Sequence, residues 1–151
     1  MRYEIDQSIK IEDTAKTTYV ALTNSKDVIV SIHAGEKKKL KKYFRSLGRP
    51  LTFKLFSFSA LCAKALSLSK TNREDLIVID IEYPGYNRNI KSYINSVLKF
   101  HALDTPDMVF QEISRHSRAH KRVYRAFKTK ERCVAVDAKW IIKLTGCLLD
   151  A

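Results

Sequence analysis

The sequence predicts an α/β domain in which a mixed β-sheet carries helices on its faces. The chain opens with three β-branched segments in close succession, a pattern typical of antiparallel strands. From residue 36 onward, amphipathic segments alternate with short apolar segments, which is typical of strands covered by helices. A chain of 151 residues has room for one domain with a single sizeable core, so we expect residues 1–151 to form one unit.

The three opening strands follow from side-chain alternation. In residues 2–9 apolar side chains alternate with polar ones, so that Asp6 lies on the acidic face of the strand. Residues 17–23 and 27–34 are rich in β-branched side chains. The three residues between them, Asn24 to Lys26, predict a hairpin turn.

The remaining elements follow from changes in the apolar period. Leu40, Tyr43, Phe44 and Leu47 are spaced as on one face of a helix, which Gly48 should end. The later segments are a short strand or helix start at 51–56, a buried helix at 57–69, a buried strand at 76–82, a helix around 90–98, a strand at 108–113, a basic helix at 117–128 and a terminal helix from 137 to about 149.

Composition restricts the classes of function. Lys and Arg number 28 against 16 Asp and Glu, a net charge of +12 that favours nucleic acid as partner over membrane. Three cysteines without a CxxC pair indicate neither a disulfide framework nor a zinc knuckle. The uninterrupted apolar runs are too short to cross a bilayer and no secretory pattern opens the chain, so a cytoplasmic protein is expected. P-loop, GxGxxG, HExxH and GxSxG motifs are missing from the sequence.

Acidic residues at strand and helix ends are the candidates for chemistry. Asp80 and Glu82 interrupt the apolar run of residues 76–82, share one face, and lie where open α/β sheets place ligands. Asp6 lies in a strand that could pair beside this run. Asp137 opens the terminal helix, where it is either an N-cap or a site carboxylate, and the two roles are compatible.

Carboxylates that converge from three elements are suited to divalent cations. Mg²⁺ and Mn²⁺ prefer oxygen ligands, and two such ions about 3.5–4 Å apart can activate a water and stabilise the leaving oxygen of a phosphodiester. The expected cofactor is therefore a pair of Mg²⁺ or Mn²⁺ ions, and the expected activity is nucleic-acid cleavage.

These features resemble the ribonuclease H superfamily. The resemblance rests on the order of elements, on IDQS in the first strand, on the acid that ends LIVIDIE and on the acid that starts the terminal helix. The first and second of these acids are more similar to RuvC-type Holliday junction resolvases than to RNA:DNA hybrid nucleases. The resemblance implies a ribonuclease H-like sheet, with Asp6, Glu82 and Asp137 as metal ligands and Asp80 as the substitute. Junction cutting would further imply a homodimer, because two symmetric strands need two sites.

One departure from that pattern keeps an alternative open. The resolvase helix presents two closely spaced acids, whereas Lys139 and Trp140 follow Asp137 here. The alternative is a non-catalytic nucleic-acid-binding module on the same fold.

A basic segment at 115–132 supplies the expected nucleic-acid contacts, with DNA favoured over RNA. Its cations, joined by two from the first helix, are Arg115, Arg118, Lys121, Arg122, Arg125, Lys128, Lys38 and Lys42. His116 and His120 share a helix face in this segment. Further ligands for zinc do not accompany them, but one of the two could assist proton transfer beside the carboxylates.

Overall fold

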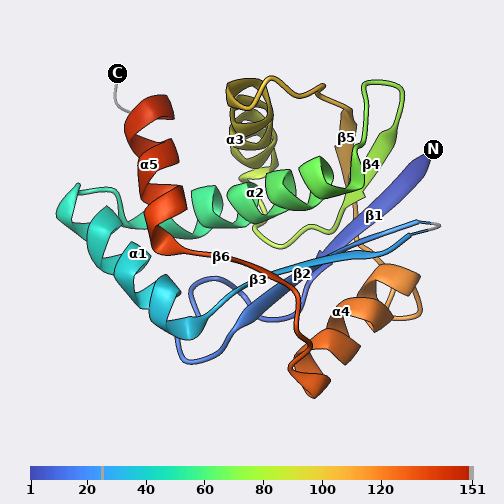
Figure 1. Cartoon of the computed structure of the whole chain (residues 1–151), viewed down its shortest axis with the longest axis horizontal. Helices are drawn as coiled ribbons and strands as arrows, with labels where there is room; N and C mark the ends of the chain where they lie inside the picture. Colours follow the sequence, from blue (N-terminus) through green and yellow to red (C-terminus); the bar gives the residue numbers. More distant parts are fainter. Residues whose placement is uncertain (25, 150–151) are drawn as a thin grey trace.

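The structure, a computed structural model, describes residues 1–24 and 26–149 and is built on a six-stranded mixed sheet (Figure 1). The strands are β1 (Arg2–Gln7), β2 (Thr18–Thr23), β3 (Val28–Ile32), β4 (Leu76–Ile79), β5 (Asp107–Phe110) and β6 (Val134–Val136). The helices are α1 (Ala34–Ser46), α2 (Pro50–Ser69), α3 (Asn87–Phe100), α4 (Arg118–Thr129) and α5 (Ala138–Leu148).

The strands lie in the order β5-β4-β1-β2-β3-β6. β2 is antiparallel to both β1 and β3, while the pairs β1–β4, β4–β5 and β3–β6 are parallel. All strands except β2 therefore end at the same edge of the sheet. This is the edge at which α/β proteins gather ligand-binding side chains.

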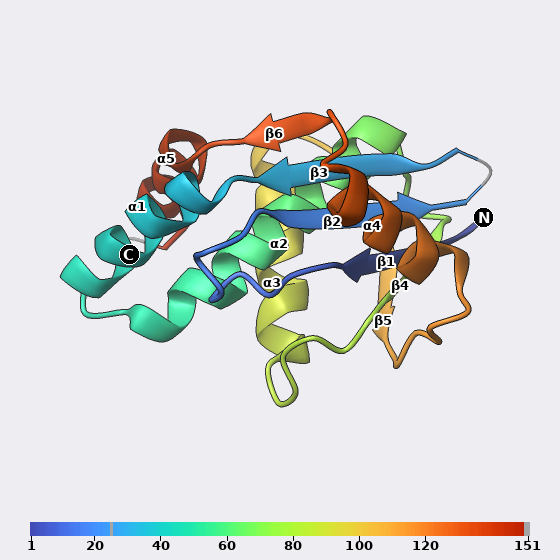
Figure 2. The same ribbon diagram turned by 90° about the horizontal axis from the view of Figure 1, so that it is seen from below.

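Helices cover both faces of the sheet unequally (Figures 1 and 2). On one face α2 packs on β2 and β3 and on the helices α1 and α3, and α5 packs on α1 and α3. The large apolar core lies here. On the other face, within the part of the chain that the structure describes, α4 is the one helix that crosses β1 and β2. It closes a second, small core in which Val123 and Ala126 contact Tyr19, Ala21 and Ile29.

The buried helix α2 is the centre of the larger core. Pro50 lies in its first turn, where a missing N–H is harmless, and Lys70 ends it in the left-handed conformation. Its 20 residues are long and apolar enough to cross a membrane, which the short apolar runs of the sequence did not indicate. In this structure 67% of its apolar window is buried inside the protein, as expected for a core helix.

The architecture confirms the predicted α/β class with a mixed sheet, and of the two alternatives for residues 51–56 it shows the helix start, because these residues belong to α2. It differs from the prediction in that β4 ends at Ile79 rather than at residue 82, β5 ends at Phe110 rather than at residue 113, and β6 was not predicted. The predicted turn at 24–26 includes Ser25, which lies outside the described residues, as do residues 150 and 151 of the predicted unit.

A further difference from expectation is Lys37. A lysine is expected at the surface, but Lys37 lies three and seven residues before the core residues Leu40 and Phe44, on the same face of α1, and is fully buried. Its Nζ donates to the backbone oxygen of Asp13 and to Thr18 Oγ1, the latter at 2.9 Å. These acceptors compensate the buried charge only in part, and burial lowers the pKa of Lys37 to about 8. Lys37 therefore anchors the β1–β2 loop to α1 instead of facing solvent.

Candidate functional site

The strand register brings two of the predicted acids together. Ile5 of β1 pairs with Ile79 of β4, and Asp80 N donates to Ile5 O at 3.0 Å, so Asp6 and Asp80 are neighbours at the ends of two parallel strands. Side chains alternate along a strand, and therefore both acids project to the face that α4 covers. Glu82, two residues after Asp80, joins them from the segment that leaves β4.

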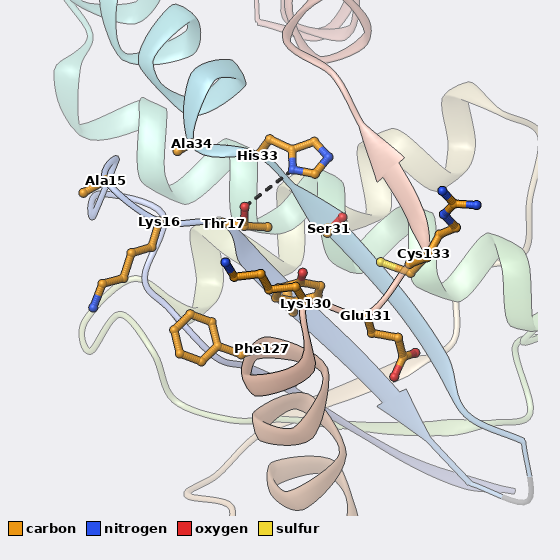
Figure 3. Close-up of a pocket in the computed structure, with 12 residues that line it drawn as sticks. Ala15, Lys16, Thr17, Ser31, His33, Ala34, Phe127, Lys130, Glu131 and Cys133 are labelled. Carbon is orange, nitrogen blue, oxygen red and sulfur yellow. Dashed lines mark hydrogen bonds between the residues drawn. The ribbon is translucent and has the colours of Figure 1, made fainter.

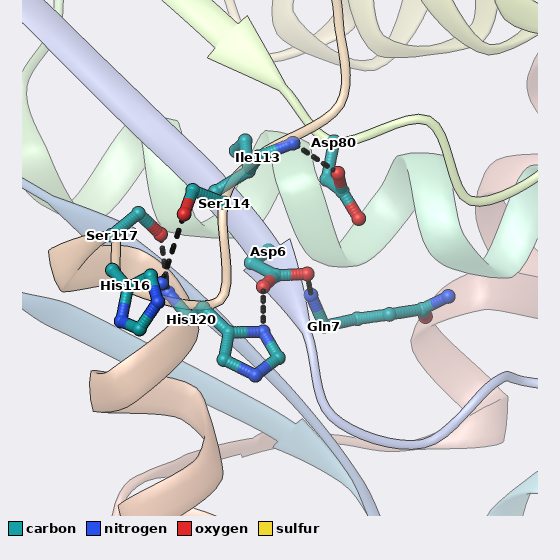
Figure 4. Close-up of polar contacts among 8 residues, drawn as sticks. All are labelled: Asp6, Gln7, Asp80, Ile113, Ser114, His116, Ser117 and His120. Carbon is teal, nitrogen blue, oxygen red and sulfur yellow. Dashed lines mark hydrogen bonds and ion pairs between the residues drawn. The ribbon is translucent and has the colours of Figure 1, made fainter.

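The carboxyl groups of Asp6, Asp80 and Glu82 form one cluster, in which one oxygen atom from each group lies within 4.8 Å of the other two. Asp6 is only 3% exposed, and its Oδ1 accepts from the backbone N–H of Gln7 at 2.8 Å. Asp80 Oδ1 accepts from the backbone N–H of Ile113 at 2.7 Å (Figure 4). The donor set is all oxygen, which fits a hard divalent cation such as Mg²⁺ or Mn²⁺.

Burial makes this cluster costly to ionise. It is the largest cause of a raised pKa at Glu82, and hydrogen bonding to Asp80 and Asp6 adds to it, so that this pKa is raised to about 9. Burial also raises the pKa of Asp6, although hydrogen bonds from Glu82 and His120 oppose the rise. Near neutral pH the cluster therefore retains a proton unless a cation takes its place.

His120 is the partner that α4 supplies to the acids. Its Nδ1 lies 3.0 Å from Asp6 Oδ2 (Figure 4). The His120 side chain is 38% exposed to solvent. A carboxylate oxygen only accepts, so Nδ1 carries the proton when Asp6 is ionised and Nε2 is left free. The other predicted histidine, His116, precedes α4 and is exposed. The sequence indicated that one of the two histidines could reach the carboxylates. In the structure His120, in the first turn of α4, is the one that contacts Asp6.

The loop between β1 and β2 is tied to the segment after β4. The hydroxyl of Tyr83 accepts from Ile11 N at 3.1 Å and donates to Glu12 Oε1 at 3.2 Å. Lys10 Nζ donates to the backbone oxygen of Glu82 at 3.0 Å. These bonds hold the β1–β2 loop beside the acids, and they place the exposed cation of Lys10 next to them. Sequence reasoning did not single out Lys10, because only the loop conformation brings it there.

Asp137 is not part of this cluster. It is the N-cap of α5, where its Oδ1 accepts from Trp140 N at 2.9 Å. The preceding strand β6 pairs with β3 at the far side of the sheet, three strands from β1, which corresponds to a separation of roughly 14 Å. Of the two roles that the sequence left open, the structure shows the N-cap.

The predicted nucleic-acid contacts divide into exposed and paired cations. Most of them are exposed, on α4 and the segment before it or on α1: Arg115, Arg118, Lys121, Arg125, Lys128, Lys38 and Lys42. Arg122 differs, because it forms a bidentate pair with Glu131 at 2.7 and 2.6 Å and a further ion pair with Asp27. Arg118 also pairs with Asp27, at 3.0 Å. The face is thus less free of acids than the sequence of the segment indicates.

Comparisons of this chain with protein-family models, with curated proteins and with solved structures gave no match.

Proposed function

We propose that this protein is a metal-dependent nuclease with its active centre at Asp6, Asp80 and Glu82. The observation that carries the proposal is the meeting of three carboxyl groups, within 4.8 Å, in a chain of net charge +12. Clustered acids in a largely buried setting are unfavourable unless a cation, a retained proton or hydrogen bonds compensate them, and such clusters are common at functional sites. The surrounding cations would attract the phosphodiester that such a centre cleaves.

Bound Mg²⁺ or Mn²⁺ would supply Lewis acidity and an activated water at this centre. The residues of the chain would do the rest. Asp6, Asp80 and Glu82 would hold the ions. His120, through its free Nε2, would exchange a proton with solvent or with the leaving group. Lys10 would face the phosphate from the opposite loop.

The finer assignment, a ribonuclease H-like resolvase of branched DNA, has support in the order of elements. The central strands β4-β1-β2-β3, with the acids on β1 and after β4, agree with what the resemblance implies. The terminal helix would then supply no ligand, and His120 of α4 would act beside the three carboxyl groups. Junction cutting would require a homodimer.

The second candidate function is a nucleic-acid-binding module without catalysis. Satisfied hydrogen bonds favour it: Ile113 N donates to Asp80, and His120 Nδ1 and Gln7 N contact Asp6. With one proton on Glu82, the cluster could stand as a structural network that needs no ion.

Cleavage assays separate the two functions. Labelled four-way junction, duplex DNA, single-stranded DNA and RNA:DNA hybrid are incubated with Mg²⁺ or Mn²⁺. We expect wild-type protein to cut at least one of them, and Asp6→Asn and Glu82→Gln to abolish cleavage while binding is unchanged or tighter, because fewer charges then repel phosphate. Binding by wild type without any cleavage would favour the binding module. Cleavage that survives Asp6→Asn would place the active centre elsewhere.

A further inference from the structure

A cavity opens on the same face of the sheet as the acids. It has a volume of about 680 Å³, within the usual range for small-molecule sites, and lies between the end of α4, the β1–β2 loop and the end of β3 (Figure 3). The cavity is separate from the acid cluster, and nothing in the proposed chemistry uses it. Its lining combines cations with aromatic and apolar groups: Lys16, Lys130, Arg132, Tyr19 and Phe127, with smaller residues between them.

The strand register fixes where this cavity lies relative to the acids. Asp6 pairs with Ala21, and Tyr19 lies two residues further along β2 opposite Ser31 of β3, so all of these side chains share one face. With strands about 4.8 Å apart and a rise of about 3.3 Å per residue, the cavity floor lies on the order of 8–12 Å from Asp6. That span corresponds to about two to four nucleotide rises of 3.4 Å.

The charge at the rim of the cavity is uncompensated. Within residues 1–24 and 26–149, Lys16, Lys130 and Arg132 take part in none of the ion pairs. The acid in the lining, Glu131, is engaged by both terminal nitrogens of Arg122. Three cations around one opening therefore attract an anion, while the ring of Phe127 offers a flat apolar surface (Figure 3).

The thiol in the lining does not suggest chemistry of its own. Burial raises the pKa of Cys133, so the thiol stays protonated and is a poor nucleophile. The cavity is thus suited to binding rather than to reaction.

We propose that this cavity binds one nucleotide of a single-stranded segment, with Lys130 as a contact to its phosphate, Lys16 and Arg132 attracting the strand, and its base against Phe127. This inference deepens the proposed function, because it assigns the strand that passes the acid cluster a second point of attachment. A single-stranded segment fits this cavity better than a duplex does, because its bases are free to leave the stack and enter a pocket.

The backbone of Lys130 offers a sharp test. Lys130 ends α4 in the left-handed conformation, at φ 51°, a position that glycine adopts without strain. Lys130→Gly therefore removes the amine without loss of stability. Lys70 ends α2 at φ 58° in the same way but far from the cavity, which makes Lys70→Gly the matched control.

Binding of a labelled single-stranded oligonucleotide is measured against salt for wild type and both variants. Each phosphate contact contributes about 0.7 to the slope of log K against log salt for single strands. We expect Lys130→Gly to weaken binding and lower the slope by about that amount, and Lys70→Gly to leave both unchanged. An equal effect of the two variants, or no effect of either, would overturn the proposal.

NMR titration of the cavity amides identifies the ligand. The oligonucleotide should shift the amide signals of Thr17, Ser31 and Cys133, and shifts with 5′-dAMP as well would show that the cavity also accepts a free nucleotide. If inorganic phosphate binds as tightly as the oligonucleotide or 5′-dAMP, the role of the base is overturned. If none of these ligands shifts the amide signals of the cavity, the site itself is overturned. Cleavage is scored separately, so wild type that cuts nothing but binds here refutes the nuclease and leaves the cavity assignment standing.

Discussion

At the scale of single residues, position in the sheet decides which acids act together. Asp6 and Asp80 meet because their strands are adjacent, parallel and in register, and Glu82 follows on the same segment. Asp137 has the same chemistry and lies at the same edge of the sheet, but β6 carries it to the far side. Four acids of similar appearance in the sequence are therefore a cluster of three and a helix cap.

Because Asp137 is a helix cap, two substitutions at this residue should differ in stability but not in cleavage. Asn caps helices about as well as Asp, so Asp137→Asn should retain both stability and metal-dependent cleavage. Asp137→Ala loses the bond to Trp140 N and should lower the free energy of unfolding by about 1 kcal/mol, again without affecting cleavage. Urea denaturation and the cleavage assay measure the two effects. Loss of cleavage in a folded Asp137→Asn protein would show that Asp137 is a ligand after all.

At the scale of elements, α4 joins the acids to the basic surface. Its inner side closes the small core through Val123 and Ala126, its first turn brings His120 to Asp6, and its outer side carries exposed cations such as Lys121 and Arg125. One helix thus contributes packing, a partner for the acids and positive charge. Its cations do not all have the same role, since Arg122 is held by Glu131 and Asp27.

Substitutions on α4 should therefore separate affinity from stability. Replacing Lys121 and Arg125 with Ala should weaken nucleic-acid binding and lower its salt dependence by about 0.9 per lost phosphate contact on duplex DNA, with unchanged stability. Arg122→Ala leaves Glu131 without its bidentate partner, and Asp27 with Arg118 alone of its two arginines, and should lower stability by about 1–3 kcal/mol. Anisotropy titrations against salt and urea denaturation distinguish these effects. A salt dependence unchanged in Lys121→Ala/Arg125→Ala would make this face only a solvated one.

Elements with strong local patterns were predictable, and elements fixed by distant contacts were not. The apolar run Leu76–Ile79 and the helical spacing around Phe44 carry their structure in a few neighbouring residues. β6 has three residues, and only its pairing with β3 makes it a strand. The burial of Lys37 depends likewise on acceptors 19 and 24 residues away in the chain.

At the scale of the whole molecule, a positively charged surface surrounds a cluster of acids. The chain carries +12 overall, yet the buried Asp6 meets the half-buried Asp80 and Glu82 at one point of the sheet edge. The positive field would bring nucleic acid to the surface, and the acids would recruit the cations that phosphodiester cleavage needs. The sequence predicted Asp6, Asp80 and Glu82 as candidates, because acids that interrupt an apolar strand pattern are visible in the local sequence, although β4 ends earlier than predicted. The place of His120 could not be predicted as firmly, since it depends on how α4 crosses the sheet.

The central claim, that Asp6, Asp80 and Glu82 bind divalent cations, is tested most directly by anomalous diffraction from crystals soaked in Mn²⁺. We expect an anomalous peak within coordination distance of all three carboxyl groups, and loss of that peak in Asp6→Asn. An anomalous peak at Asp137 instead, or ordered carboxyl groups that hydrogen-bond one another with no peak between them, would contradict the account.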